Sequence, residues 1–231
     1  MELINLKIMS ININIRKAID PLVKVLFGGI HLVYGYKIHC KINLLLHYFY
    51  TWWIYPNFKH AGKNLVVYHP IQLKGAEYIT IGDHTTIGRR GVVTAWGNYG
   101  QQQLSPKITI GNDCDFGEYL HVSCTNSITI GNNVLTGRWV TIIDNSHGRS
   151  DFDDMQQPPA VRNVVSKGPV VIQDNVWIGD KVTVMPGITI GTGAIVGANS
   201  VVCQDIPPYA IAAGCPAKII KKADHNINET T

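Results

Sequence analysis

The sequence predicts an all-β solenoid, a parallel β-helix whose triangular coils are made from six-residue repeats. An aliphatic residue followed by glycine recurs at this spacing, first at Ile81-Gly82 and Ile87-Gly88. Further along the chain the same position forms an unbroken ladder at Ile172, Ile178, Val184, Ile190, Val196 and Val202. Two polar insertions interrupt this frame without ending it, as expected for a regular array that carries loops on one face.

A period of six residues matches neither an α-helix nor the simple alternation of a β-strand. It fits short strands that each point one aliphatic side chain inward and then turn, so that three strands make one coil of roughly 18 residues. We expect glycine or asparagine after the inward residue to allow the tight backbone of each corner. Successive coils then stack their inward residues into one apolar column.

The repeat divides the chain into three parts. Residues 1–65 lack it and are predicted to be mainly helical, with Asp20-Pro21 suited to the start of a helix. Residues 66–207 form the β-helix, with insertions at 94–107 and 145–168, and residues 208–231 form a C-terminal tail. The helical segment is expected to cap the open end of the solenoid, to touch a membrane through the apolar and aromatic residues 42–55, or to do both.

Composition narrows the class of protein. The 231 residues are 45% hydrophobic and 16% charged, which suits a long aliphatic core. A net charge of +4 is too mild to indicate nucleic acid as a partner. The five cysteines are scattered and form no CxxC pair, which favours free thiols in a reducing compartment. With no secretory signal or spanning apolar stretch in view, we expect a cytoplasmic protein that can also lie at the inner face of the membrane.

Three stretches carry a family resemblance: ITIGNNVLTGRWVTIIDNSHG at 128–148, KGPVVIQDNVWIGDKVTVMPGITIGTGAIVGANSVV at 167–202, and IPPYAIAAGCPAKII at 206–220. Together they resemble the bacterial hexapeptide-repeat O-acetyltransferases, in the branch that modifies maltose, galactosides and polysaccharides such as O-antigen or capsule. The resemblance covers roughly residues 66–222. It implies a left-handed parallel β-helix, a homotrimer, and acetyl-CoA bound in a groove between neighbouring β-helices.

The resemblance also assigns residues to the reaction. The family's base is a histidine at the start of the loop, and here that residue is His147. A neutral imidazole, with an ordinary pKa of about 6.5, can accept a proton at working pH. Asp144 is expected either to orient this ring or, as a corner residue, to bond the neighbouring backbone.

Residues one coil before His147 and in the first insertion are candidates for contact with the acceptor, and the resemblance maps further residues to acetyl-CoA. The acceptor is expected near Glu118 and His121, although His121 is equally well explained as a structural histidine. Trp96 and Tyr99 in the first insertion could stack on a sugar ring. Contacts to acetyl-CoA are expected from Trp177, Asp180, Ala198, Lys218 and Lys221. No metal is expected.

The leading hypothesis is acetyl-CoA-dependent O-acetylation of a sugar, glycolipid or polysaccharide precursor. Two alternatives remain open: acetylation of the amino group of a nucleotide sugar, and a non-catalytic β-solenoid scaffold. A zinc hydratase of the γ-carbonic-anhydrase type needs three converging histidines. The sequence lacks the His-x4-His pair of that class.

Overall fold

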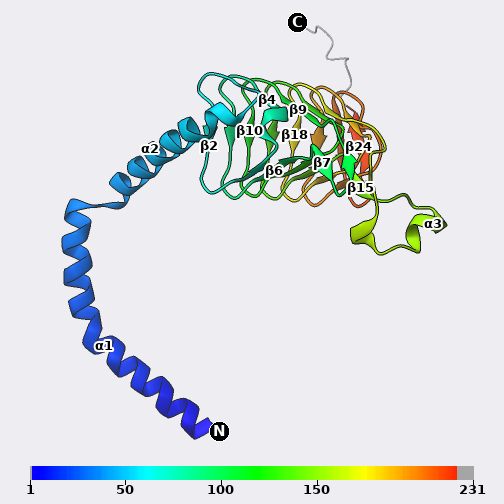
Figure 1. Ribbon diagram of the computed structural model, residues 1–231. Helices are drawn as coiled ribbons and strands as arrows, with labels where there is room; N and C mark the ends of the chain where they lie inside the picture. Colours follow the sequence, from blue (N-terminus) through cyan, green and yellow to red (C-terminus); the bar gives the residue numbers. More distant parts are fainter. Residues whose placement is uncertain (1, 223–231) are drawn as a thin grey trace, which may run out of the picture. The chain divides into compact units, whose positions relative to one another are not determined.

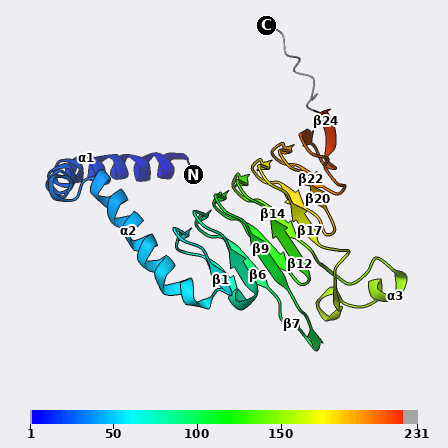
Figure 2. The same ribbon diagram turned by 90° about the horizontal axis from the view of Figure 1, so that it is seen from above.

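The computed structural model describes residues 2–222, with side chains from residue 15 onward. The chain divides into two compact units, Met1–Leu46 and His47–Thr231. The first unit contains helix α1 (Glu2–Val33) and the start of helix α2 (Tyr36–Ile54). The second contains the end of α2 and a stack of coils built from short strands (Figures 1 and 2).

From β1 to β22, consecutive strands of the stack go to three parallel sheets in turn, so each sheet takes one strand from every coil. Sheet 2 continues with two further strands, β23 and β24, of which the last is antiparallel. Sheet 1 consists of β1 (His60–Ala61), β4 (Ile79–Ile81), β9 (Lys107–Ile110), β12 (Ser127–Ile130), β17 (Val170–Ile172) and β20 (Thr189–Ile190). Sheet 2 consists of β2 (Val66–Val67), β5 (Thr86–Ile87), β10 (Asp115–Phe116), β13 (Leu135–Thr136), β18 (Trp177–Ile178), β21 (Ile195–Val196), β23 (Ala210–Ala213) and β24 (Lys218–Lys222). Sheet 3 consists of β3 (Gln72–Lys74), β6 (Val92–Ala95), β11 (His121–Cys124), β14 (Thr141–Ile143), β19 (Thr183–Val184) and β22 (Val201–Val202).

The core is the column of inward residues that the six-residue spacing predicts. Each member of the predicted ladder is at most 1% exposed: Ile172, Ile178, Val184, Ile190, Val196 and Val202. A second buried position, two residues earlier in each repeat, was not predicted; examples are Leu120, Val140 and Val182, each 0% exposed. The two positions together explain how such short strands exclude water from the centre of the stack.

Glycine after the inward residue has a different purpose from the one expected. Gly88 has no positive φ; the left-handed residue at that corner is Arg90, with φ of 58°. A Cβ at Gly88 would lie 2.6 Å from the carbonyl carbon of Gly117 and 2.7 Å from the amide nitrogen of Glu118, both on the next coil. Glycine is therefore required by the close approach of neighbouring coils, and the expectation of a corner glycine with special backbone geometry is wrong here.

A column of side chains also links the coils at one corner. The backbone N–H of Asp83 donates to Oδ1 of Asn112 at 2.8 Å, and that of Asn112 donates to Oδ1 of Asn132 at 2.9 Å. The N–H of Asn132 then donates to Oδ1 of Asp174 at 2.7 Å. Each coil thus satisfies a corner N–H of the coil before it, which buried or turning backbone requires.

The two insertions fold into short elements of their own. The first forms the hairpin β7 (Asn98–Tyr99) and β8 (Gln102–Gln103). The second contains β15 (Ser146–His147), helix α3 (Phe152–Met155), a 3-10 turn at Pro159–Val161 and β16 (Val164–Val165), with β15 and β16 antiparallel. Gln102 ties the two insertions together, because its side chain exchanges hydrogen bonds with the backbone of Val164 at 2.7 and 3.2 Å.

The end of α2 covers the first coil. His47, Thr51 and Ile54 are buried, at 7%, 3% and 6% exposure. Strand β2 is the first strand of sheet 2, so the N–H of Val67 has no earlier strand to bond. It donates instead to Oγ1 of Thr51 at 2.9 Å, and the same hydroxyl donates to the carbonyl of His47 at 2.8 Å. The end of the helix thus provides a hydrogen-bond acceptor for the edge strand of sheet 2, which would otherwise have an unpaired N–H.

We expect Thr51→Val to destabilise the second unit, because it leaves the buried N–H of Val67 without an acceptor. Such a loss costs about 1–3 kcal/mol in the free energy of unfolding. Urea denaturation measures the change, and Thr51→Ser, which keeps the hydroxyl, is the matched control. Equal stability of the Val and Ser variants would show that this hydrogen bond does not secure the first coil.

Candidate active site

His147 lies where the fourth coil gives way to the second insertion. Strand β14 ends at Ile143, and four residues later His147 pairs with Val164 across the β15–β16 ribbon. Its side chain is exposed and lines a hollow of about 700 Å³. The floor of this hollow is the outer face of sheet 3, with His121 and Met185, and the wall is the 145–168 insertion. A rigid floor and a loop wall form the usual arrangement for a substrate site.

The first insertion supplies the partner of the His147 ring. The Tyr99 hydroxyl lies 3.2 Å from Nδ1 of His147, and the two rings meet edge to face with centroids 5.4 Å apart. If Nδ1 carries the proton and donates to the Tyr99 oxygen, Nε2 keeps its lone pair and can act as a base. Tyr99 was considered as a residue that stacks on a sugar; the structure instead places it against the histidine.

The expected pairing of Asp144 with His147 is not what the structure shows. The Asp144 side chain is 0% exposed. Its oxygens accept hydrogen bonds from the N–H groups of Thr125 and Asn126, both at 2.8 Å, and from Nδ2 of Asn145 at 3.0 Å. A carboxylate that is surrounded in this way fixes the turn after β11 and leaves the histidine ring to Tyr99. The structure therefore favours the corner interpretation of Asp144.

His121 stands on the floor of the same hollow. It is the first residue of β11 and is aligned across sheet 3 with Thr141 of the next coil. Burial lowers the pKa of its imidazole. A neutral imidazole presents one donor and one acceptor, which suits contact with a hydroxyl-bearing acceptor.

Trp96 lies close to His147 and Tyr99. A small hollow of about 70 Å³ is lined by Trp96, Tyr99 and His147. The Trp96 indole N–H donates to the hydroxyl of Ser123 at 3.2 Å, and the Lys74 ammonium lies 3.9 Å from the ring centroid. These contacts hold the indole within the protein, so its ring is less free to stack on a sugar than the sequence suggested.

Glu118 does not line the hollow that His121 and His147 share. It lies before Tyr119, whose φ of 61° turns the chain at the corner, so Glu118 faces sheet 2 while His121 faces sheet 3. There it borders a separate hollow with Arg138, whose Nε is 3.8 Å from the carboxylate. The two residues that we expected to share one site thus lie on different faces of the chain.

The five residues expected to contact acetyl-CoA gather along sheet 2. Trp177 lies on β18 with 51% of its surface exposed. Lys218 and Lys221 are exposed on β24. Asp180 and Ala198 are exposed at the corners that follow β18 and β21, and Oδ1 of Asp180 accepts the N–H of Arg138 at 2.8 Å. In a single chain these residues and His147 therefore lie on adjacent faces, with a corner between them.

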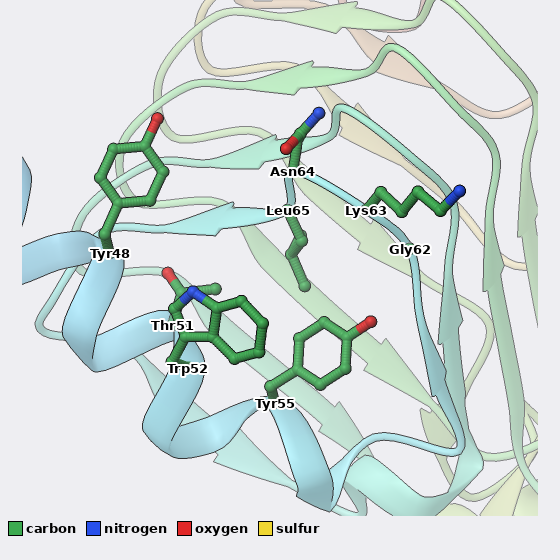
Figure 3. Close-up of a pocket in the computed structure, with 8 residues that line it drawn as sticks. All are labelled: Tyr48, Thr51, Trp52, Tyr55, Gly62, Lys63, Asn64 and Leu65. Carbon is green, nitrogen blue, oxygen red and sulfur yellow. The ribbon is translucent and has the colours of Figure 1, made fainter.

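A fourth hollow, of about 330 Å³, lies at the first coil (Figure 3). Tyr48 and Trp52 of α2, with Tyr55 of the turn that follows it, extend toward Leu65, and Lys63 lies beside them. It lies three coils from the strand that precedes His147, roughly 14 Å along the stack at ~4.8 Å per strand. This hollow is therefore separate from the histidine site.

Side chains suited to metal binding or covalent catalysis are not grouped near the histidines. Within residues 15–222, whose side chains the structure describes, no three His, Cys, Asp or Glu side chains are placed to hold a metal ion. Burial raises the pKa of the Cys124 thiol, and the Asp144 carboxylate raises it further. Cys124 is therefore a poor source of thiolate at neutral pH.

Comparison with known proteins identifies the family. The model described as bacterial transferase hexapeptide (six repeats) matches residues 169–204. The putative lipopolysaccharide biosynthesis O-acetyl transferase WbbJ of Escherichia coli K12 is 35% identical over 164 residues, which cover 69% of this chain and 80% of WbbJ. The probable acetyltransferase Rv3034c of Mycobacterium tuberculosis is 33% identical over 183 residues, covering 75% of this chain and 57% of the relative. The chain belongs to the hexapeptide-repeat acetyltransferase family and is an acyltransferase.

A solved structure shows the same fold. A point mutant of AntD, an N-acyltransferase from Bacillus cereus, was crystallised in complex with dTDP-4-amino-4,6-dideoxyglucose and coenzyme A. It aligns with a TM-score of 0.60 at 21% identity and covers 74% of this chain and 88% of AntD. At this identity the likeness establishes the architecture of the coils.

The lowered pKa of His121 predicts how stability depends on pH. The unfolded chain takes up this proton near pH 6.5, whereas the folded chain does so only at lower pH. The free energy of unfolding should therefore fall as the pH drops below about 6.5. We expect His121→Gln to reduce this fall, measured by urea denaturation between about pH 7.5 and 5.5. The exposed His60→Gln is the control, and identical pH profiles for wild type and His121→Gln would contradict the prediction.

Proposed function

We propose that the protein transfers an acetyl group from acetyl-CoA to a hydroxyl of a sugar, glycolipid or polysaccharide precursor. The observation that carries the proposal is His147, held by Tyr99 at the edge of a 700 Å³ hollow with one ring nitrogen left for the acceptor. The name of WbbJ, an O-acetyl transferase of lipopolysaccharide biosynthesis, supports an oxygen acceptor on a glycan. The complex of AntD with a nucleotide sugar and coenzyme A supports the two substrate classes.

His147 acts as the general base in this mechanism. Its Nε2 accepts the proton of the acceptor hydroxyl while the oxygen attacks the carbonyl carbon of the thioester. The tetrahedral intermediate then collapses, the carbon–sulfur bond breaks, and the proton passes from Nε2 to the departing sulfur. Both substrates are present together, so no acyl-enzyme forms and no cysteine is required.

The proposal includes a homotrimer of left-handed coils with the active site between two chains. In a single chain, the residues expected at acetyl-CoA lie on sheet 2 and His147 lies beyond sheet 3. A neighbouring chain could set its sheet 2 opposite the hollow and complete the site. Lys218 and Lys221 would then meet the phosphates as mobile cations, and Trp177 would offer an apolar surface. The lysines carry the opposite charge to these phosphates, which supports their role.

We also propose that the protein works in the cytoplasm. All five cysteines lie within the described residues and are free of disulfides, which suits a reducing compartment.

Acetylation of an amino group is the alternative, favoured by the amino sugar in the AntD complex. A histidine base can serve either nucleophile, so the acceptor itself must decide. Purified protein, acetyl-CoA and a panel of sugars, glycolipids and amino sugars would be mixed, and free CoA followed with a thiol reagent. Release that depends on a hydroxyl acceptor supports the proposal, release only with amino sugars supports the alternative, and no acetyl-CoA binding by calorimetry supports a scaffold.

His147→Ala should lower kcat by about 10²–10⁴-fold, the usual contribution of a general base. Binding of acetyl-CoA should remain, because the cofactor is expected on sheet 2. The same CoA-release assay measures the change, with the exposed His84→Ala as control. Retention of full activity by His147→Ala would exclude it as the base.

Tyr99→Phe should lower kcat about fivefold, since it removes one hydrogen bond to the His147 ring worth about 1 kcal/mol. The KM for acetyl-CoA should not change. Tyr55→Phe, which removes a tyrosine hydrogen bond to the carbonyl of Ala61 at the first coil, is the matched control. A change in KM alone would assign Tyr99 to substrate binding and not to positioning the base.

A further inference from the structure

The helical part of the chain exposes far more apolar surface than the coils do. Of the 30 large hydrophobic side chains that are exposed among the described residues, 21 lie between Ile15 and Trp53. The exposed fractions are high, for example 75% for Leu22, 87% for Leu32 and 75% for Trp53. Exposed apolar side chains in this number mark a contact site with another molecule or with lipid.

Between residues 15 and 33 the charges of α1 occupy one face of the helix. Arg16, Asp20 and Lys24 are four residues apart, and Lys17, Lys24 and His31 are seven apart. With 3.6 residues per turn, these positions fall within an arc of about 100°. The remaining arc carries exposed aliphatic side chains along its length: Ile15, Ile19, Leu22, Val25, Leu26, Ile30, Leu32 and Val33. Such a wide apolar face is broader than the seam of a helix pair and suits insertion into lipid.

The charges that remain are strongly biased in sign. Between residues 15 and 53 the chain carries Arg16, Lys17, Lys24, Lys37 and Lys41, against Asp20 as the single acidic residue. A basic face beside a wide apolar face complements an anionic lipid surface, where each Lys or Arg near the headgroups strengthens binding.

Helix α2 is partly buried at its end and exposed along the part before it. Its end packs on the first coil through His47, Thr51 and Ile54. Trp52 and Trp53 lie on the same stretch but are 71% and 75% exposed, as are most of the apolar residues before them. Indole rings favour the boundary between water and the bilayer interior.

The length and apolarity of the two helices bear on whether they cross a bilayer. Among the described residues no single helix is long and apolar enough to span a membrane. Residues 15–33 and 36–57 pass the length and composition test only as a pair, and they are bent by 56° at the break between them. A bent pair of helices, the first with its charges between residues 15 and 33 on one face, fits the interfacial region.

We propose that residues 15–53 bind the surface of an anionic phospholipid bilayer and so hold the enzyme at the membrane. The apolar arc of α1 inserts among the acyl chains, and the basic face remains at the phosphates. This inference does not depend on the acetyl-transfer chemistry, because no residue of the hollow around His147 takes part in it.

Flotation of the full-length protein with phospholipid vesicles tests the proposal. Vesicles containing phosphatidylglycerol should bind at least tenfold more protein than pure phosphatidylcholine vesicles, and added salt should weaken the binding. The double variant Lys17→Gln/Lys24→Gln should bind about 25-fold more weakly, at about fivefold for each cation lost. Asp20→Asn, on the same face, should bind more tightly, which a general loss of folding would not produce.

A second pair of changes tests the apolar arc. Leu22→Ser/Leu26→Ser should abolish flotation, while circular dichroism of the coils and acetyl transfer to a water-soluble acceptor stay unchanged. No flotation of the wild-type protein with anionic vesicles would overturn the proposal. So would a molecular mass in light scattering that falls in Leu22→Ser/Leu26→Ser without any change in lipid binding, because the helices would then join copies of the chain.

Discussion

Each coil of this protein forms its backbone hydrogen bonds with the coils above and below it, and this constraint governs the rest of the structure. Neighbouring backbones approach to the distance between paired strands, about 4.8 Å, everywhere along the stack. Side chains at equivalent positions must therefore stack on one another. Rows of glycine, of asparagine or aspartate, and of buried aliphatics follow from that repetition. The sequence repeats because the distance between neighbouring coils is the same throughout the stack.

The candidate site arises where this regularity stops. The repeat offers a flat and rigid outer face, on which His121 is held by the strands on either side. The insertions add what a regular coil cannot, a wall and an exposed histidine. Tyr99 and His147 come from different insertions, 48 residues apart, and meet because the 94–107 and 145–168 segments both follow strands of sheet 3, in the second and the fourth coil. The bond between Gln102 and Val164 fixes the two insertions in that relation.

Sequence reasoning succeeded where a residue belongs to the repeat. The spacing of Ile172 and its successors predicted their burial. It failed where position depends on one corner or on a contact between insertions. A left-handed residue at Tyr119 separates Glu118 from His121, although they are three apart in sequence. Asp144 was expected either to orient His147 or to bond the neighbouring backbone, and its carboxylate accepts hydrogen bonds from two backbone N–H groups. The six-residue repeat could not predict the contact between Tyr99 and the ring of His147, because both residues lie in insertions.

The last strand of sheet 2 has a consequence beyond any role of its lysines toward a substrate. Strand β24 runs antiparallel to β23, so the direction of the strands reverses at this end of the sheet. It carries Lys218, Lys221 and Lys222, which are exposed. A parallel ladder that ended on a bare, neutral strand would accept the first coil of another molecule and continue as a fibre. Clustered ammonium groups on a reversed strand repel such an addition, and Thr51 blocks the first strand of the same sheet. Both ends of sheet 2 thus oppose the end-to-end addition of another chain.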